Sequence, residues 1–316
     1  MKAKRLLALF TVLALLLGVV GCSNTSTEPP KTGETPTPPP AAATDQVKGQ
    51  LFVDTNWLKA NLDKVIVLDV RVAKDYQAGH IPGAINSPWQ SLANMTGKSG
   101  DTGWGTILPA DQLAAKLGAM GINGEKAIIT YGSPPGWGED GRVMWVLNMA
   151  GIKNVKMLDG GWKAWQGIQG AESKDVPAPA AVSFKIASLN QDLNVNTDYV
   201  KENLNKIKIV DVRSEKEYGG ATDFGEARGG HLPGAINLPF GKMFNENGTI
   251  KSSDDLQKLF ADAGLTPGDR IVTYCTKGIR SGHMALVLRN LGFNNASNWD
   301  ASFYEWAGNA ALPLEK

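Results

Sequence analysis

Cysteine and histidine are scarce in this chain of 316 residues, which has two cysteines and three histidines. No Cys/His cluster has the spacing of a metal site. No Gly-rich loop follows a strand in the pattern that binds a nucleotide phosphate. The sequence therefore gives no reason to expect a metal or another cofactor.

An excess of either charge is also missing. The chain has 32 Lys and Arg against 31 Asp and Glu, for a net charge of +1. A nearly neutral balance gives no reason to expect nucleic acid or an acidic surface as a partner. The length is greater than one average domain needs, and it suits two domains that each bury a core.

Long apolar runs are missing after the N-terminus, where a basic start precedes an apolar stretch over residues 6–20. This pattern is too short for a typical span and predicts a signal peptide over residues 1–21. The ending V-V-G-C resembles a bacterial lipobox, which implies a lipid on Cys22. The alternative is an ordinary signal peptide with Cys22 near the cut by chance.

Residues 22–45 are rich in Pro and Thr and contain no aromatic residue. Such a segment cannot bury a core and is typical of an extended spacer. We therefore expect a protein tethered by lipid to a bacterial membrane surface, outside the cytoplasm, without spanning the membrane.

The rest of the chain is an internal repeat. Three pairs of segments match in the same order: 53–71 with 195–213, 79–88 with 230–239, and 127–132 with 270–275. The repeat predicts a first domain over residues 46–172, a Pro/Ala-rich linker over 173–185 and a second domain over 186–316.

Each repeat alternates short Val/Ile-rich runs with segments of helical period. Continuous apolar runs are typical of strands buried on both faces of a parallel sheet. The sequence thus predicts an α/β fold of two tandem domains, each a mainly parallel sheet with helices on both faces. Thr55 and Thr197 are expected to cap the first helix of each domain. Ligands of such sheets bind beyond the carboxyl ends of the strands, where Cys275 lies.

The segment CTKGIRS that begins at Cys275 favours negative charge. A thiol attacks as the thiolate. Lys277 and Arg280 supply positive charge, Gly278 allows a tight turn, and the loop amides can form an anion-binding nest. A helix expected from about Ser281 adds the positive end of its dipole. The alternative is that Cys275 is a small buried apolar residue.

The order DVR, GH[IL]PGAIN and C-x-x-G-x-R-S, present in this chain, resembles the rhodanese family of sulfurtransferases. WDASFYEW at residues 299–306 is similar to a signature near the C-terminus of tandem-domain members. In that family usually only the C-terminal domain is catalytic. The first repeat has Gly132 where the second has Cys275, so we expect a non-catalytic first domain.

The resemblance implies that Cys275 takes sulfur from thiosulfate, becomes a persulfide and passes the sulfur to cyanide or a thiol. The alternatives are 3-mercaptopyruvate as donor, or a non-catalytic persulfide carrier or sensor. Related phosphatases use C-x5-R, a loop that makes room for a phosphate. Only four residues separate Cys275 from Arg280 here, so the pocket is expected to be too tight for a phosphatase. The expected substrate-binding residues follow Cys275 directly: Thr276, Lys277, Gly278, Ile279, Arg280 and Ser281.

Other residues admit two interpretations. Arg213 is interpreted as part of a structural ion pair rather than an anion ligand, because Arg71 matches it in the other repeat. His80 and His231 occupy one repeated turn and are expected to stabilise it. His283 either tunes the thiolate or lies on the surface. Trp137 either reaches across the cleft or has a plain packing or surface role.

Overall fold

A computed structural model describes residues 45–316. The predicted signal peptide, Cys22 and nearly all of the tether lie outside the described residues. The first repeat contains α1 (Gln46–Leu51), β1 (Phe52–Val53), α2 (Thr55–Asn61), β2 (Val65–Asp69), α3 (Ala73–Ala78), β3 (Ile85–Asn86), η1 (Trp89–Leu92), α4 (Ala110–Ala119), β4 (Ala127–Tyr131), α5 (Glu139–Met149), β5 (Val155–Leu158) and α6 (Gly161–Gly167).

The second repeat has the same order of elements, except that a short 3-10 helix stands in place of α1. It contains η2 (Gln191–Leu193), β6 (Asn194–Val195), α7 (Thr197–Asn203), β7 (Lys208–Asp211), α8 (Glu215–Tyr218), β8 (Ile236–Asn237), η3 (Phe240–Met243), α9 (Ser253–Asp262), β9 (Ile271–Tyr274), α10 (Ile279–Asn290), β10 (Ala296–Trp299) and α11 (Ser302–Gly308).

Both repeats form five-stranded sheets with the same strand order. The first is β1-β5-β4-β2-β3 and the second is β6-β10-β9-β7-β8. Every pairing within them is parallel. The predicted α/β fold of two tandem, mainly parallel domains is confirmed. In both sheets the strand before the active-loop position, β4 or β9, is central, so the loop that follows it lies among several strand ends.

Helices cover both faces of each sheet because successive strand residues point to opposite sides. On β2, Leu68 belongs to one buried cluster with α4 and α5 residues. Its neighbour Val67 belongs to another, with Leu58 of α2 and Trp165 of α6. The second sheet is covered in the same way, by α9 and α10 on one face and by α7 and α11 on the other.

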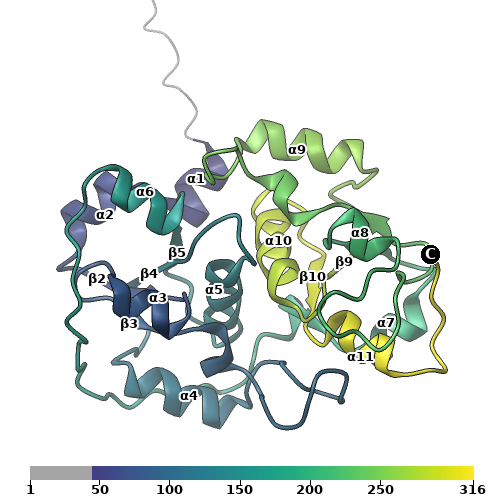
Figure 1. Ribbon diagram of the computed structural model, residues 1–316, viewed down its shortest axis with the longest axis horizontal. Helices are drawn as coiled ribbons and strands as arrows, with labels where there is room; N and C mark the ends of the chain where they lie inside the picture. Colours follow the sequence, from purple (N-terminus) through teal and green to yellow (C-terminus); the bar gives the residue numbers. More distant parts are fainter. Residues whose placement is uncertain (1–44) are drawn as a thin grey trace, which may run out of the picture. The chain divides into compact units, whose positions relative to one another are not determined.

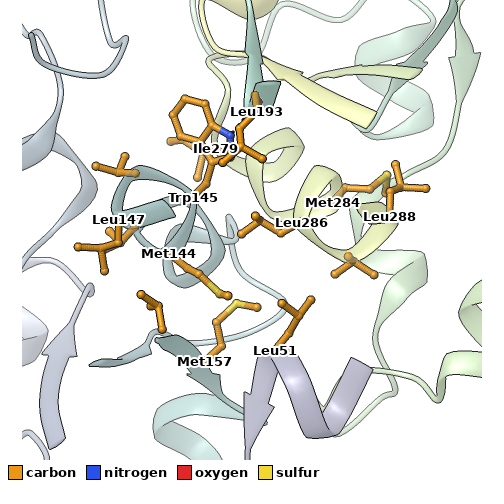
Figure 2. Close-up of a cluster of buried hydrophobic side chains, with 14 of the residues drawn as sticks. Leu51, Met144, Trp145, Leu147, Met157, Leu193, Ile279, Met284, Leu286 and Leu288 are labelled. Atoms are coloured by element: carbon orange, nitrogen blue, oxygen red, sulfur yellow. Dashed lines mark hydrogen bonds between the residues drawn. The ribbon is translucent and has the colours of Figure 1, made fainter. Parts of the chain in front are cut away.

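The two domains share one core across their contact. Helices α5 and α10 pack side by side between the sheets (Figure 1). Figure 2 shows side chains of both helices, among them Met144, Trp145 and Leu286, gathered in one buried cluster. Both helices are buried on nearly every side, so each domain relies on the other to cover its helix at this contact.

The segment that begins each repeat packs against the other domain. In α1, the Val47 amide donates to Ser253 Oγ and the Gln46 side chain to the Asn290 carbonyl. In return, the Trp145 indole of α5 donates to the carbonyl of Leu193, before β6. The first residues of the range predicted for each domain therefore pack against the neighbouring domain.

One local prediction was wrong. Thr55 and Thr197 are the first residues of α2 and α7 rather than their caps. The caps are the preceding Asp54 and Asn196, whose side chains accept hydrogen bonds from the amides of Trp57 and Tyr199. A carboxylate or amide oxygen does this at least as well as a threonine hydroxyl. Among residues 45–316, no helix combines the length and apolar character that crossing a membrane requires.

Candidate active site

Cys275 follows β9 directly, and α10 begins four residues later at Ile279. This is earlier than the start expected near Ser281, so Arg280 and Ser281 lie in the first helical turn. The Cys275 side chain is buried but lines a cavity of about 370 Å³. Residues of both repeats form its wall: Val72, Trp89, Gln90, Trp137, Glu139, Phe224, Cys275, Thr276, Lys277, Ile279, Arg280 and Tyr304.

The segment after β10 holds the backbone of the Cys275 loop. The carbonyls of Cys275 and Thr276 accept hydrogen bonds from the amides of Phe303 and Tyr304 at 3.1 and 3.0 Å. The Cys275 amide donates to Ser302 Oγ at 3.2 Å. With its carbonyls fixed on one side, the loop is free to present amide groups on the other, toward the thiol.

The environment of Cys275 favours the thiolate. Burial alone would raise the pKa of this thiol. The charge of Arg280 and hydrogen bonds from Ser281 and from the Lys277 amide lower it by more than burial raises it, so the net pKa is below the ordinary value. Ser281 contributes its backbone amide, while its hydroxyl donates to Asn298 Oδ1 at 2.7 Å. A thiol with a lowered pKa holds more of the nucleophilic thiolate than an ordinary cysteine does.

Arg280 is not free to bind an anion with its whole guanidinium. Its two terminal nitrogens donate to the Glu217 carboxylate at 2.9 and 2.7 Å, and both side chains are buried. Thr276 joins them, because its hydroxyl donates to Glu217 at 3.0 Å and accepts from Arg280 at 2.8 Å. The positive charge of Arg280 is therefore largely balanced by Glu217.

Lys277 is the cation of the cavity that has no such partner. Within residues 45–316, no carboxylate lies within salt-bridge distance of its ammonium. Three aromatic rings surround it instead: Trp89, Trp104 and Tyr304, with centroids 5.0, 5.5 and 5.7 Å from Nζ. Burial lowers the pKa of Lys277. A desolvated ammonium held against ring faces attracts an incoming anion more strongly than one in water.

Trp137 reaches the cavity from the first domain. Its ring lies 4.9 Å from the guanidinium carbon of Arg280 and meets the ring of Phe224 edge to face at 4.8 Å. It remains 44% exposed, as expected for a residue at the mouth of a cavity. Of the two interpretations, reaching across the cleft agrees with the structure.

The remaining predicted binding residues shape the loop. Gly278 adopts a left-handed conformation, with φ of +78°, and precedes α10. Ile279 is buried in the shared core and also lines the cavity. Sequence analysis missed the rings around Lys277, because Trp89 and Trp104 lie in the other repeat and no short-range pattern links them to the thiol.

Arg213 and the histidines have structural surroundings. Arg213 is paired with Asp211 at 2.6 Å, as Arg71 is with Asp69 at 2.5 Å, so both arginines hold the same turn. His80 and His231 stack on Tyr76 and Tyr218 in matching places. The surface alternative for His283 is wrong: its ring is fully buried and packs against Phe52, Phe240 and Phe244.

The first repeat has a different loop at the matching place. Gly132 follows the end of β4, and the longer segment after it carries Glu139 into the cavity. Burial raises the pKa of Glu139. The first domain thus contributes walls to the site of the second and, at Gly132, has no thiol of its own.

Comparisons with known proteins agree with this geometry. The family model "Rhodanese-like domain" matches residues 54–168 and 196–309. A Saccharopolyspora erythraea protein named "Putative thiosulfate sulfurtransferase" is 32% identical over 279 residues, which cover 84% of this chain and 96% of that protein. "Sulfur carrier protein TtuD" of Thermus thermophilus is 29% identical over 283 residues, covering 84% and 97%.

Among solved structures, an anaerobic ergothioneine biosynthesis enzyme from Chlorobium limicola matches with a TM-score of 0.74 and 22% identity. The match covers 84% of this chain and 70% of that one. At this identity the likeness concerns the fold.

Proposed function

Because the chain belongs to the rhodanese family of sulfurtransferases, we propose that it transfers sulfane sulfur from thiosulfate to a thiophilic acceptor through a persulfide on Cys275. One observation carries the proposal: a buried thiol with a lowered pKa faces a cavity that holds one cation without a carboxylate partner. We assign catalysis to Cys275 and anion binding to Lys277. Thr276, Gly278, Ile279, Arg280 and Ser281 form the loop that surrounds the transferred sulfur.

In the first half-reaction the Cys275 thiolate attacks the outer sulfur of thiosulfate. A bond forms between Sγ and that sulfur, the bond to the sulfonate sulfur breaks, and its electron pair leaves with sulfite. Lys277 neutralises charge on the sulfonate end. The loop amides, which already favour negative charge at Cys275, stabilise the persulfide without reorganising.

In the second half-reaction the acceptor attacks the terminal sulfur of the persulfide. With cyanide as acceptor, the new carbon–sulfur bond forms thiocyanate while the electron pair of the S–S bond returns to Cys275 as the thiolate. A thiol acceptor leaves as its own persulfide in the same way. The enzyme completes a double displacement.

Two alternatives deserve separate tests. With 3-mercaptopyruvate as donor, the Lys277 ammonium would bind a carboxylate in place of a sulfonate. The similarity to a protein named as a sulfur carrier favours the second alternative, a persulfide carrier that loads Cys275 and passes sulfur only to a specific partner. A lipid on Cys22 and a bacterial membrane surface outside the cytoplasm complete the proposal for where the protein works.

The first test is steady-state sulfur transfer from thiosulfate to cyanide by the full-length chain, with 3-mercaptopyruvate as the competing donor. We expect thiocyanate with thiosulfate and none from Cys275→Ala. Lys277→Gln should raise KM for thiosulfate by about tenfold or more, the cost of one charge-assisted contact, because the sulfonate loses its cation.

Lys216→Gln, which removes an exposed lysine paired with Asp223, is the matched control and should leave KM unchanged. Loading of Cys275 with one sulfur atom, seen by mass spectrometry, without multiple turnovers would favour the carrier. Turnover that survives Cys275→Ala would contradict the persulfide mechanism altogether.

A further inference from the structure

Arg142 of the non-catalytic domain extends into the catalytic one. It lies in α5 and its side chain is buried, with 1% of its surface exposed. The guanidinium donates to the carboxylate of Asp300 and, at 3.3 Å, to the carbonyl of Gly278. Its plane also lies over the ring of Trp145, 4.5 Å from the centroid.

Both acceptors belong to the frame of the Cys275 loop. Gly278 is the residue from which α10 starts, and its carbonyl also accepts from the Asn298 side chain at 3.2 Å. Asp300 begins the segment that holds the Cys275 and Thr276 carbonyls. The other oxygen of Asp300 accepts from the Ile107 amide at 2.7 Å, which is a second contact from the first domain.

The internal repeat shows that this contact is not a general feature of the domain interface. Asp159 follows β5 as Asp300 follows β10, and it too accepts an amide from the opposite domain, from Ile250 at 2.8 Å. Arg142 and His283 occupy matching positions in the two repeats, because each precedes the glycine after its helix, Gly151 or Gly292, by the same number of residues. Of these two matching positions, only the one that faces the Cys275 loop is an arginine.

We propose that Arg142 is a positioning residue for sulfur transfer, supplied by the non-catalytic domain to fix the start of α10 around Cys275. One terminal nitrogen of the guanidinium, Nη1, donates to both Gly278 and Asp300, so the helix start and the segment after β10 keep one relative position. The Ser281 and Lys277 amides are then aimed at Sγ. The non-catalytic domain would then position the Cys275 loop, in addition to lining the cavity.

The test compares Arg142→Met with Arg142→Lys by the rate at which iodoacetamide alkylates Cys275 across a pH series. Losing the two Nη1 hydrogen bonds lets the loop amides turn away, so the thiol pKa should rise and alkylation at neutral pH should slow by about tenfold. The lysine keeps a charge beside Asp300 and should recover part of the rate. Turnover with thiosulfate should fall by on the order of 100-fold in kcat, because small displacements of reacting groups are costly.

Arg71→Met is the matched control. Arg71 is also a buried arginine of the first domain, but its side chain bonds to Asp69 and Gly79 of its own domain. It should lower thermal stability without moving the alkylation profile. If Arg142→Met moves the profile no more than this control does, the inference is overturned.

Two further outcomes are separable. Should Arg142→Met fail to fold because it leaves Asp300 buried without its partner, Arg142→Met with Asp300→Asn removes both charges and is measured in the same way. The turnover readout rests on the proposed function, whereas alkylation does not. A shifted profile in a protein that turns over no thiosulfate would support Arg142 and count against the donor.

Discussion

The carboxylate of Glu217 sets how much positive charge the cavity offers. It takes the whole fork of Arg280 and the hydroxyl of Thr276, and it is itself held by Ser214 through the capping box of α8. Arg280 can therefore polarise the thiol while Lys277 remains for the donor. A charged pair buried in this way is costly to break from one side only.

Glu217 also predicts how the protein responds to acid. Burial alone would raise the pKa of this carboxyl. Arg280 and Ser214 lower it by more than that, to about 2 from the ordinary 4.5. A carboxyl with a lowered folded-state pKa stabilises the fold fully above its unfolded-state value and loses that contribution as pH falls toward the folded one. We expect the unfolding free energy to drop by on the order of 3 kcal/mol between about pH 4.5 and 2 from this group.

Urea unfolding at a series of acidic pH values measures this. Glu217→Gln should be less stable at neutral pH and should lose less stability on acidification, since the amide does not titrate. Glu215→Gln in the same helix, where the side chain is exposed, should keep the wild-type pH dependence. An unchanged acid slope in Glu217→Gln would contradict the assignment.

At the scale of elements, the turn between β9 and α10 depends on Gly278. An L side chain there would be strained at φ of +78°, and its Cβ would lie 2.4 Å from the carbonyl oxygen of Asp300. That oxygen belongs to the backbone of the segment that supports the loop, so it cannot move cheaply. Strain and collision act together at one residue.

Gly278→Ala should therefore cost clearly more than the 1–2 kcal/mol or so of left-handed strain alone, and it should abolish most sulfur transfer. Gly264→Ala is the matched control. Gly264 follows the C-cap of α9 with φ of +74°, and nothing lies within 4 Å of the Cβ that would be added. It should lose about 1 kcal/mol with kcat unchanged. Thermal unfolding and steady-state rates on both variants decide; equal losses of stability would argue against the collision.

At the scale of the whole molecule, the exchanged first segments and the shared core should make the two domains unfold together. Trp145 and Leu286 belong to one buried cluster, and α1 is bonded to the second domain. Thermal unfolding followed by tryptophan fluorescence and by circular dichroism should give one coincident transition.

Gly141→Ala is expected to weaken this coupling. The added Cβ would lie 2.1 Å from Cγ of the buried His283 ring, across the contact between α5 and α10. Overpacking of this kind typically costs about 1–3 kcal/mol, and here the cost falls on the interface, so the two probes should separate. Gly167→Ala in α6, where nothing lies within 4 Å, should keep one transition. A single transition in Gly141→Ala as well would contradict the assignment of the coupling to this contact, and two transitions in the unchanged protein would contradict the shared core.

The sequence by itself determined the repeat, the parallel α/β class and the place of Cys275 at a strand end. These features depend on local apolar periodicity and on residues close in the chain, such as Lys277 and Gly278 beside the thiol. It also predicted the pairing role of Arg213, because Arg71 repeats it.

Only the tertiary structure decided which charges the site keeps. Whether Arg280 is free or held by Glu217 depends on where two segments far apart in the chain meet. Two of the rings around Lys277, Trp89 and Trp104, and the Arg142 guanidinium come from the other domain. Such contacts follow from how the two sheets pack through α5 and α10, and burial changes the strength of a charge by more than any local pattern does. For that reason composition showed a nearly neutral chain, while the Cys275 thiol lies among charges that only the packed interface could place.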